Sequence, residues 1–170
     1  GLLTKHTTAM EATNEDFSEY SKYKDDYREK FSKDVRIKNF YDDFEAIYDN
    51  EQFWSKVTKD CYSCGSCNLS CPTCFCFNVK DDMQLNLTTG KKTREWDSCM
   101  IPEYGLVAGE HNFRPNKENR LKQRYRCKLK TFKEKLGNYS CVGCGRCIEV
   151  CMAKINIADD IDSVKKEVSI

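Results

Sequence analysis

Cysteine is the residue whose number and spacing in this chain point to chemistry. Ten of the twelve cysteines fall into two short runs, CYSCGSCNLSCPTCFC from Cys61 to Cys76 and CVGCGRCIEVC from Cys141 to Cys151. Each run contains the spacing C-x2-C-x2-C-x3-C. Thiolates bind iron and zinc strongly, and three of them at two-residue intervals can face one metal group from a single tight loop. The two runs therefore predict two metal-binding loops.

The repeated spacing is that of the bacterial ferredoxin run, which binds [4Fe–4S] clusters. In two-cluster ferredoxins, three cysteines of a run hold one cluster and the fourth reaches the other cluster. Zinc sites usually show pairs of cysteines instead. We therefore predict cluster I on Cys61, Cys64, Cys67 and Cys151, and cluster II on Cys141, Cys144, Cys147 and Cys71.

Glycines inside the two runs favour tight loops. Gly65, Gly143 and Gly145 permit unusual backbone angles and a close approach of amide N–H groups to cluster sulfur. Pro72 follows the fourth cysteine of the first run, whereas Met152 stands at the corresponding place in the second. This difference leaves the predicted ligands intact.

The predicted clusters have no open position for a substrate, because each has four cysteine ligands. The chain has only two histidines, His6 and His111, and no arrangement of base and nucleophile accompanies the cysteines. Clusters with a full set of ligands transfer single electrons. The sequence therefore predicts a non-catalytic electron relay within an oxidoreductase.

Four cysteines remain after this assignment, namely Cys74, Cys76, Cys99 and Cys127. Three interpretations stay open for them: buried or incidental thiols, a third [4Fe–4S] cluster, or a structural zinc. Pro72 and Thr73 make a turn that can bring Cys74 and Cys76 to one side. Cys127 lies off the apolar face of its predicted helix, so core packing does not explain it well.

Composition and charge exclude several classes of protein. The net charge of +1 gives no general reason to expect binding to nucleic acid or to an anionic membrane. Hydrophobic residues make up 39% even with all 12 cysteines counted, so the aliphatic core must be thin and bound metal should help to organise the fold. No apolar run approaches the ~20 residues of a membrane span. The bunched cysteines and the absence of a signal-like start predict a reducing cytoplasm rather than a secreted disulfide framework.

Apolar periodicity predicts helices outside the cysteine runs. Apolar residues at steps of three and four predict helices over 16–31, 37–48 and 115–136, a short helix after Asn50, and a last helix that carries Ile161, Val164 and Val168. We expect their apolar stripes to pack in the core. Between the runs, alternation at Leu85 and Leu87 and the turn signal Thr89-Gly90 predict a β-hairpin within 77–96.

The helix predicted over 115–136 is strongly basic. Residues 114–136 carry ten basic and two acidic side chains, a net charge of +8. Three interpretations compete: a solvated face, a docking face for an acidic protein partner centred on Lys122, Arg126 and Lys130, and charges that offset the buried clusters. Nucleic acid is the weakest interpretation, because one basic helix has no groove-reading motif.

The order of several motifs resembles a known family. CYSCGSCNLSCPTCFC, EWDSCM, GEHNFRP, RYRCK and CVGCGRCIEVC together resemble the dicluster iron–sulfur domain shared by the iron–sulfur subunit of anaerobic sulfite reductases and the beta subunit of soluble nickel–iron hydrogenases. The resemblance covers roughly residues 38–158. Where the family typically has His, this sequence has Cys127, which exchanges one metal-ligating side chain for another.

This resemblance implies a fold and a set of partners. The implied fold is mainly α: an α-helical ferredoxin-like dicluster domain over 53–170, with a small β-hairpin insertion, preceded by an N-terminal helical arm over 1–52 that ends a larger N-terminal part. The long gap between Cys71 and Cys141 agrees with this better than with a minimal ferredoxin. The implied partners are a flavin- and NAD(P)H-binding subunit and a terminal catalytic subunit of the sulfite reductase or hydrogenase type, with the sulfite reductase type favoured.

Two other functions compete with this interpretation. A zinc-stabilised interaction module would use the same cysteines, although their spacing disfavours it. A free-standing ferredoxin would carry the same clusters without permanent partners. The long insertion between the runs and the basic helix favour docking surfaces, and hence a subunit of a complex.

Overall fold

The computed structural model describes residues 10–31 and 40–168. The chain divides into two compact units, residues 1–36 and residues 37–170, and each unit is described by itself. Residues 1–9 of the arm predicted over 1–52, and Ile37 of the helix predicted over 37–48, lie outside the described residues.

The first unit contains one helix, α2 (Asn14–Glu29), within its described part. Thr13 caps it through a capping box: the Thr13 Oγ1 accepts from the Asp16 backbone N–H, and the Asp16 carboxylate accepts from the Thr13 N–H at 2.7 Å. The aromatic stripe of this helix was expected in the core, and that prediction is wrong. The stripe residues are 49–61% exposed, and they are Phe17, Tyr20, Tyr23, Tyr27 and Phe31. Spacing predicts which residues share a face but not what covers that face.

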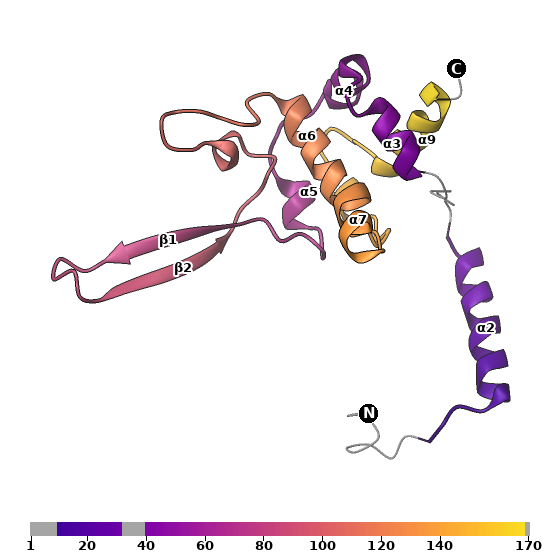
Figure 1. Cartoon of the computed structure of the whole chain (residues 1–170). Helices are drawn as coiled ribbons and strands as arrows, with labels where there is room; N and C mark the ends of the chain where they lie inside the picture. Colours follow the sequence, from indigo (N-terminus) through magenta and orange to yellow (C-terminus); the bar gives the residue numbers. More distant parts are fainter. Residues whose placement is uncertain (1–9, 32–39, 169–170) are drawn as a thin grey trace. The chain divides into compact units, whose positions relative to one another are not determined.

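The second unit has a helical core (Figure 1). Its helices are α3 (Phe40–Ile47), α4 (Glu51–Thr58), α6 (Lys117–Arg126) and α9 (Ile157–Val168). Trp54 is its largest fully buried side chain and contacts the rings of Phe44, Phe53 and Tyr125 edge-on. Helix α3 packs against α9, and α4 packs against α6. The predicted core stripes of these helices are confirmed at Phe44, Ile47, Phe53, Trp54, Leu121, Tyr125, Leu129, Ile161 and Val164.

The predicted long basic helix is present in three consecutive segments. Asn116 caps α6 by accepting from the Asn119 N–H, a π-helical segment η2 (Cys127–Thr131) follows, and α7 (Phe132–Leu136) completes the helix. Gly137 ends it in the left-handed conformation, with φ of 75°. A π-helical turn widens the helix locally and is common at functional sites. Here it begins at Cys127.

Two short helices follow the second cysteine of each run and contain the third. They are α5 (Ser66–Leu69) and α8 (Arg146–Glu149), and they contact each other. Gly65 and Gly145 precede them in the left-handed conformation, with φ of 79° and 74°. The two runs therefore adopt matching local structures although 80 residues separate them in the sequence.

A β-hairpin lies between the first run and the basic helix (Figure 1). Strands β1 (Phe77–Met83) and β2 (Gly90–Trp96) pair antiparallel, with Phe77 opposite Trp96. The hairpin was predicted within 77–96, but Leu85 and Leu87 lie in its turn rather than in a strand. The Asn86 side chain accepts from the backbone N–H groups of Thr88 and Thr89, and an Asx-type turn of this kind ends the strand early. A short 3₁₀ helix, η1 (Pro102–Gly105), follows the hairpin.

The prediction of a mainly α, α-helical ferredoxin-like fold is wrong. The structure is about 49% helical, with one small two-stranded antiparallel sheet. Cysteine loops, the hairpin and the connection around η1 occupy much of the remainder, because their Cys, Gly, Pro and Asn residues favour turns over helices. Between the two runs, the helix from α6 to α7 is the one long helical stretch within the described residues. None of the helices that the structure describes is long and apolar enough to cross a membrane.

Candidate metal centre

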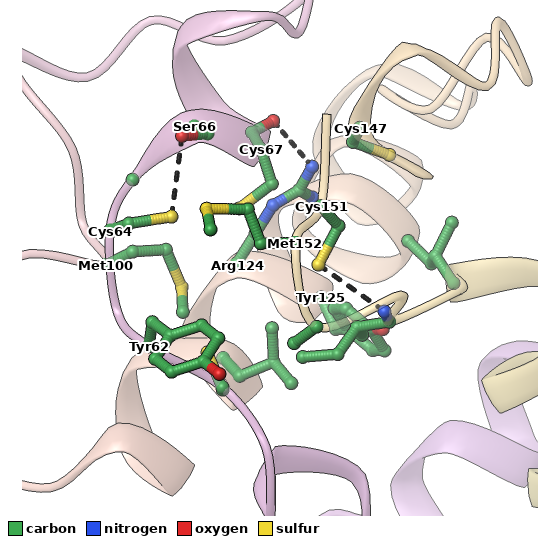
Figure 2. Close-up of a pocket in the computed structure, with 16 residues that line it drawn as sticks. Tyr62, Cys64, Ser66, Cys67, Met100, Arg124, Tyr125, Cys147, Cys151 and Met152 are labelled. Carbon is green, nitrogen blue, oxygen red and sulfur yellow. Dashed lines mark hydrogen bonds between the residues drawn. The ribbon is translucent and has the colours of Figure 1, made fainter. Parts of the chain in front are cut away.

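Cysteines from both runs line one cavity in the second unit. Five cysteines line it: Cys61, Cys64 and Cys67 come from the loop before α5 and from its first turn, Cys147 lies in α8, and Cys151 follows α8. Figure 2 shows the thiols of Cys64, Cys67 and Cys151 around the side chain of Met152. Apolar side chains complete the walls, among them Met100, Leu121 and Ile157. The four residues that the sequence predicted for cluster I thus line one cavity, together with Cys147, which was predicted for cluster II.

The loops around the cysteines are held by left-handed residues. Ser63 has a φ of 54° and Gly143, at the equivalent position of the second run, has a φ of 68°. Backbone N–H groups approach cysteine sulfur at both ends of the cavity: Ser63 N lies 3.5 Å from Cys61 Sγ, and Ile155 N lies 3.4 Å from Cys151 Sγ. Such N–H groups stabilise thiolates and bound cluster sulfur.

The second predicted set is assembled around Cys147. The thiol of Cys147 interacts electrostatically with Cys141, Cys71 and Cys144, the other three residues predicted for cluster II. Thr73 connects the two runs, because its Oγ1 donates to the Ser140 carbonyl oxygen at 2.7 Å. This bond places the residues after Cys71 beside the start of the second run.

Lys128 also connects the residues after Cys71 to the start of the second run. Its carbonyl oxygen accepts from the N–H groups of Ser140 and Cys141, both at 3.1 Å, and its Nζ donates to the Thr73 carbonyl oxygen at 2.9 Å. Burial opposes the charged form of Cys71, but the hydrogen bond from Thr73 and the charge of Lys128 outweigh it and lower the pKa of Cys71. Metal-binding cysteines must be thiolates, so this environment suits a ligand.

Arg124 is a buried cation next to both predicted clusters. It is 3% exposed and donates from Nη2 to the Cys67 carbonyl oxygen at 2.9 Å. Burial by itself would lower the pKa of Arg124, but the nearby thiols of Cys67 and Cys147 raise it instead. Cubane clusters with four thiolates carry net negative charge, and Arg124 offsets it inside the protein.

The remaining four cysteines line a second cavity, of about 220 Å³. They are Cys74, Cys76, Cys99 and Cys127. All twelve cysteines of the chain, each of which the structure describes, are free thiols. Among residues 10–31 and 40–168, no three histidine, cysteine or carboxylate side chains are placed to hold a single metal ion. The thiols therefore surround cavities, and the ligand assignments stay predictions.

Four of the ten basic side chains of residues 114–136 are buried, so a solvated face describes only part of this helix, such as Lys133 and Lys135. Arg120, Arg124, Lys128 and Lys130 are buried. Lys130 Nζ pairs with the Glu45 carboxylate, and Lys122 Nζ lies 3.2 Å from the Asp49 carboxylate. Arg126 donates to the Tyr48 hydroxyl. All three side chains of the predicted docking face, Lys122, Arg126 and Lys130, therefore have partners within the protein, and Lys130 is buried, so a docking face centred on them is wrong. Of the three interpretations, offsetting buried charge is the one that Arg124 and Lys128 favour.

Sequence reasoning did not single out two residues of the site. Arg124 was one of ten basic residues, and its signal is its place between Leu121 and Tyr125 on the helix, beside the apolar stripe. Asn68 lies inside the first run and is 2% exposed. No spacing pattern in the sequence predicts a role for Asn68, because its partners Ser98 and Cys99 lie 30 and 31 residues away.

Comparison with known proteins decides the family. Residues 60–155 match the family described as a 4Fe-4S dicluster domain. This chain belongs to the 4Fe-4S dicluster family. The match contains both cysteine runs and the segment between them, so the resemblance seen in the sequence is confirmed. As a dicluster protein, the chain is an iron–sulfur protein of the electron-transfer kind.

One relative of this dicluster protein is sulfhydrogenase 2 subunit beta from Pyrococcus furiosus. The two are 33% identical over 156 residues, which cover 92% of this chain and 46% of the relative. The chain therefore spans about half the length of the curated relative that it matches. No solved structure matches the chain.

The first cavity has the groups that a [4Fe–4S] cluster requires. A [4Fe–4S] cluster needs thiolate ligands, N–H donors and charge compensation in a place shielded from water. The first cavity provides cysteines from both runs, N–H groups near Cys61 and Cys151, and the Arg124 guanidinium. The residues present fit the group.

Proposed function

We propose that this chain is the iron–sulfur electron-transfer subunit of a multi-subunit oxidoreductase. One observation carries the proposal: Cys151 lines the same cavity as Cys61, Cys64 and Cys67, although it ends the other run. Each bound cluster would accept and release one electron at a time. Cross-ligation keeps two such clusters close together, which suits a relay between a donor and an acceptor.

We propose the ligand sets that the sequence predicted. Cluster I is held by Cys61, Cys64, Cys67 and Cys151, and cluster II by Cys141, Cys144, Cys147 and Cys71. The lining of the first cavity supports the first set, and the electrostatic contacts of Cys147 support the second. The corresponding dicluster domain would be 53–170, preceded by the arm over 1–52.

The protein's own residues then have distinct tasks. The apolar side chains of Met100, Leu121 and Ile157 form part of the walls around cluster I. Arg124 compensates negative charge between the clusters, and Lys128 does so beside Cys71.

We propose a flavin- and NAD(P)H-binding subunit as donor and a hydrogenase-type catalytic subunit as terminal partner, in the cytoplasm. The relative named as a sulfhydrogenase beta subunit supports the hydrogenase over a sirohaem sulfite reductase. A free-standing ferredoxin is the competing function. Anaerobic affinity purification of the tagged, natively expressed protein tests it: stable recovery of a flavoprotein and a catalytic subunit supports the complex, and recovery of the chain alone contradicts it.

The ligand sets are tested by Cys151→Ala in anaerobically prepared protein. The expected result is damage to cluster I, seen as a changed EPR and Mössbauer signal, because one of its irons loses its thiolate. The control is Met152→Ala, which removes a neighbouring side chain of the same cavity without removing a thiol. Alteration of the cluster that Cys141, Cys144 and Cys147 hold, with cluster I intact, would contradict the assignment.

A further inference from the structure

We propose that Cys74, Cys76, Cys99 and Cys127 bind a third [4Fe–4S] cluster. None of these four cysteines belongs to the repeated C-x2-C-x2-C-x3-C spacing, and the site goes beyond the two-cluster relay, which needs only eight of the twelve cysteines. The proposal starts from the shared cavity: all four thiols line one space of about 220 Å³, although 53 residues separate the first cysteine from the last.

The fold gathers these cysteines through two elements. The β-hairpin returns the chain to its starting point, and the Asp97 N–H donates to the Cys76 carbonyl oxygen at 3.2 Å. Cys99 therefore lies beside Cys76, and the Cys76 thiol interacts with both Cys74 and Cys99. Cys127 comes from the start of the π-helical segment and interacts with Cys76 and Cys74.

Polar side chains are already directed at two of the sulfurs. The Asn68 Nδ2 donates to Cys99 Sγ at 3.1 Å, and the Gln123 Nε2 donates to Cys127 Sγ at 3.2 Å. Amide N–H groups at this distance stabilise thiolates and tune cluster potential. Asn68 is 2% exposed, so this contact is a built feature of the interior rather than a surface accident.

Three positively charged side chains line this cavity, and one of them has a buried N–H group that makes no hydrogen bond to the described residues. Arg114 lines it, and the Arg114 Nε is buried without a hydrogen-bond partner among the described residues. A buried N–H group without a partner is unfavourable, and a cluster sulfur in this cavity would satisfy it. Arg124 and Lys128 line the same space. These three cations would offset the negative charge of a cubane with four thiolate ligands.

Two features favour a cluster over a structural zinc. The two zinc ligands of a pair typically have two to four residues between them, whereas only Phe75 stands between Cys74 and Cys76. The space of about 220 Å³ between the thiols is also far larger than a single ion requires. A cubane spreads its four thiolates over four irons and fills such a space.

The third cluster would stand next to both others. Arg124 lines the cavity of cluster I as well as this cavity. Cys74 follows Cys71 of cluster II by three residues, and the Cys74 N–H donates to the Cys71 carbonyl oxygen at 3.1 Å. An electron that reaches either ferredoxin cluster would therefore have a third site nearby, and the relay would gain a branch or an exit.

Iron, sulfide and zinc are measured on anaerobically purified, unmodified protein. We expect about twelve irons and twelve sulfides per chain and no stoichiometric zinc, because each cubane holds four irons. About eight irons without zinc would overturn the proposal, and so would about eight irons with one zinc. This measurement needs no variant and so does not depend on the folding of one.

A pair of variants locates the third cluster. Cys99→Ala should lower the iron content by about four per chain and leave the EPR signals of clusters I and II in place. Cys127→Ser serves as the second variant, because Cys99 is buried and its loss can affect folding. The control is Phe75→Leu, which lies between two of the thiols and should keep about twelve irons. Full iron content in both cysteine variants would overturn the assignment, even if the two-cluster relay is correct.

Discussion

Arg124 donates a hydrogen bond from its Nη2 to the backbone carbonyl oxygen of Cys67 at 2.9 Å, across 57 residues of sequence. The guanidinium is 3% exposed and lines both thiol cavities. A single side chain thus joins the basic helix to the first cysteine run and puts a fixed positive charge between the proposed clusters.

Replacement of this arginine should shift a reduction potential. We expect Arg124→Met to lower the potential of cluster I by on the order of 60 mV, because a nearby positive charge favours the reduced cluster and a tenfold change in a one-electron equilibrium is about 59 mV. Redox titration followed by EPR measures it. Arg124→Lys should retain most of the potential, and Arg28→Met on the exposed helix α2 should leave it unchanged. An unchanged potential in a folded Arg124→Met protein would show that this charge does not act on the cluster.

The buried pair between Lys130 and Glu45 should contribute to stability. The Nζ of Lys130, in η2, is buried against α3, where it pairs with the half-exposed carboxylate of Glu45. Lys130→Met should lower the free energy of unfolding by about 0.5–1 kcal/mol, because the half-exposed carboxylate loses its charged partner but keeps its contact with water. Thermal unfolding under anaerobic conditions measures it. The control Lys135→Met removes an exposed lysine of the next helix and should cost less than about 0.5 kcal/mol. Equal effects of the two variants would contradict this role.

Asp160 should make stability depend on pH. Burial raises the pKa of Asp160 to about 6, and the charge of Asp159 adds to the rise, although the hydrogen bond from Tyr125 opposes it. The folded protein therefore binds the proton more tightly than the unfolded chain, so stability falls as pH rises from about 4 to about 6. The loss is at most about 3 kcal/mol, because one pKa unit corresponds to about 1.4 kcal/mol.

Asp160→Asn should remove this dependence. We expect the variant to gain stability relative to the unmodified protein as pH rises from 5 to 7, because the amide stays neutral at every pH. Unfolding midpoints at both pH values, measured anaerobically, give the difference. A difference of the same size at pH 5 and pH 7 would show that the carboxyl does not titrate in this range.

The two left-handed residues at equivalent positions of the cysteine loops should differ in how much a substitution destabilises them. Gly143 has a φ of 68°, and a Cβ built there meets nothing within 4 Å, so Gly143→Ala tests the backbone alone. We expect a loss of about 1 kcal/mol. Ser63, at the equivalent position, already bears this strain and accepts from Arg120 Nη2 at 3.1 Å. Ser63→Gly should therefore relieve strain but lose that bond, with little net change. Comparison of cluster loss rates under an iron chelator tests both, and faster loss in Ser63→Gly than in Gly143→Ala would contradict the explanation.

Local sequence determined the features that depend on neighbouring residues. The two C-x2-C-x2-C-x3-C runs specified the cysteine loops, and Asn116 and Gly137 specified where the basic helix begins and ends. The hairpin followed from its turn residues. Each of these features is set by hydrogen bonds or backbone angles within a few residues, so spacing and residue type were sufficient.

Tertiary structure decided what long-range packing controls. The shared cavity of Cys61 and Cys151, and the meeting of Cys76 with Cys99 and Cys127, depend on contacts between distant segments that no local pattern contains. The same holds for Lys130, whose charge looked solvent-facing in the sequence but lies buried against Glu45. The class of the fold was mispredicted for the same reason. Helical periodicity shows where helices can form, but the extent of the loops between them depends on how the cysteines are brought together.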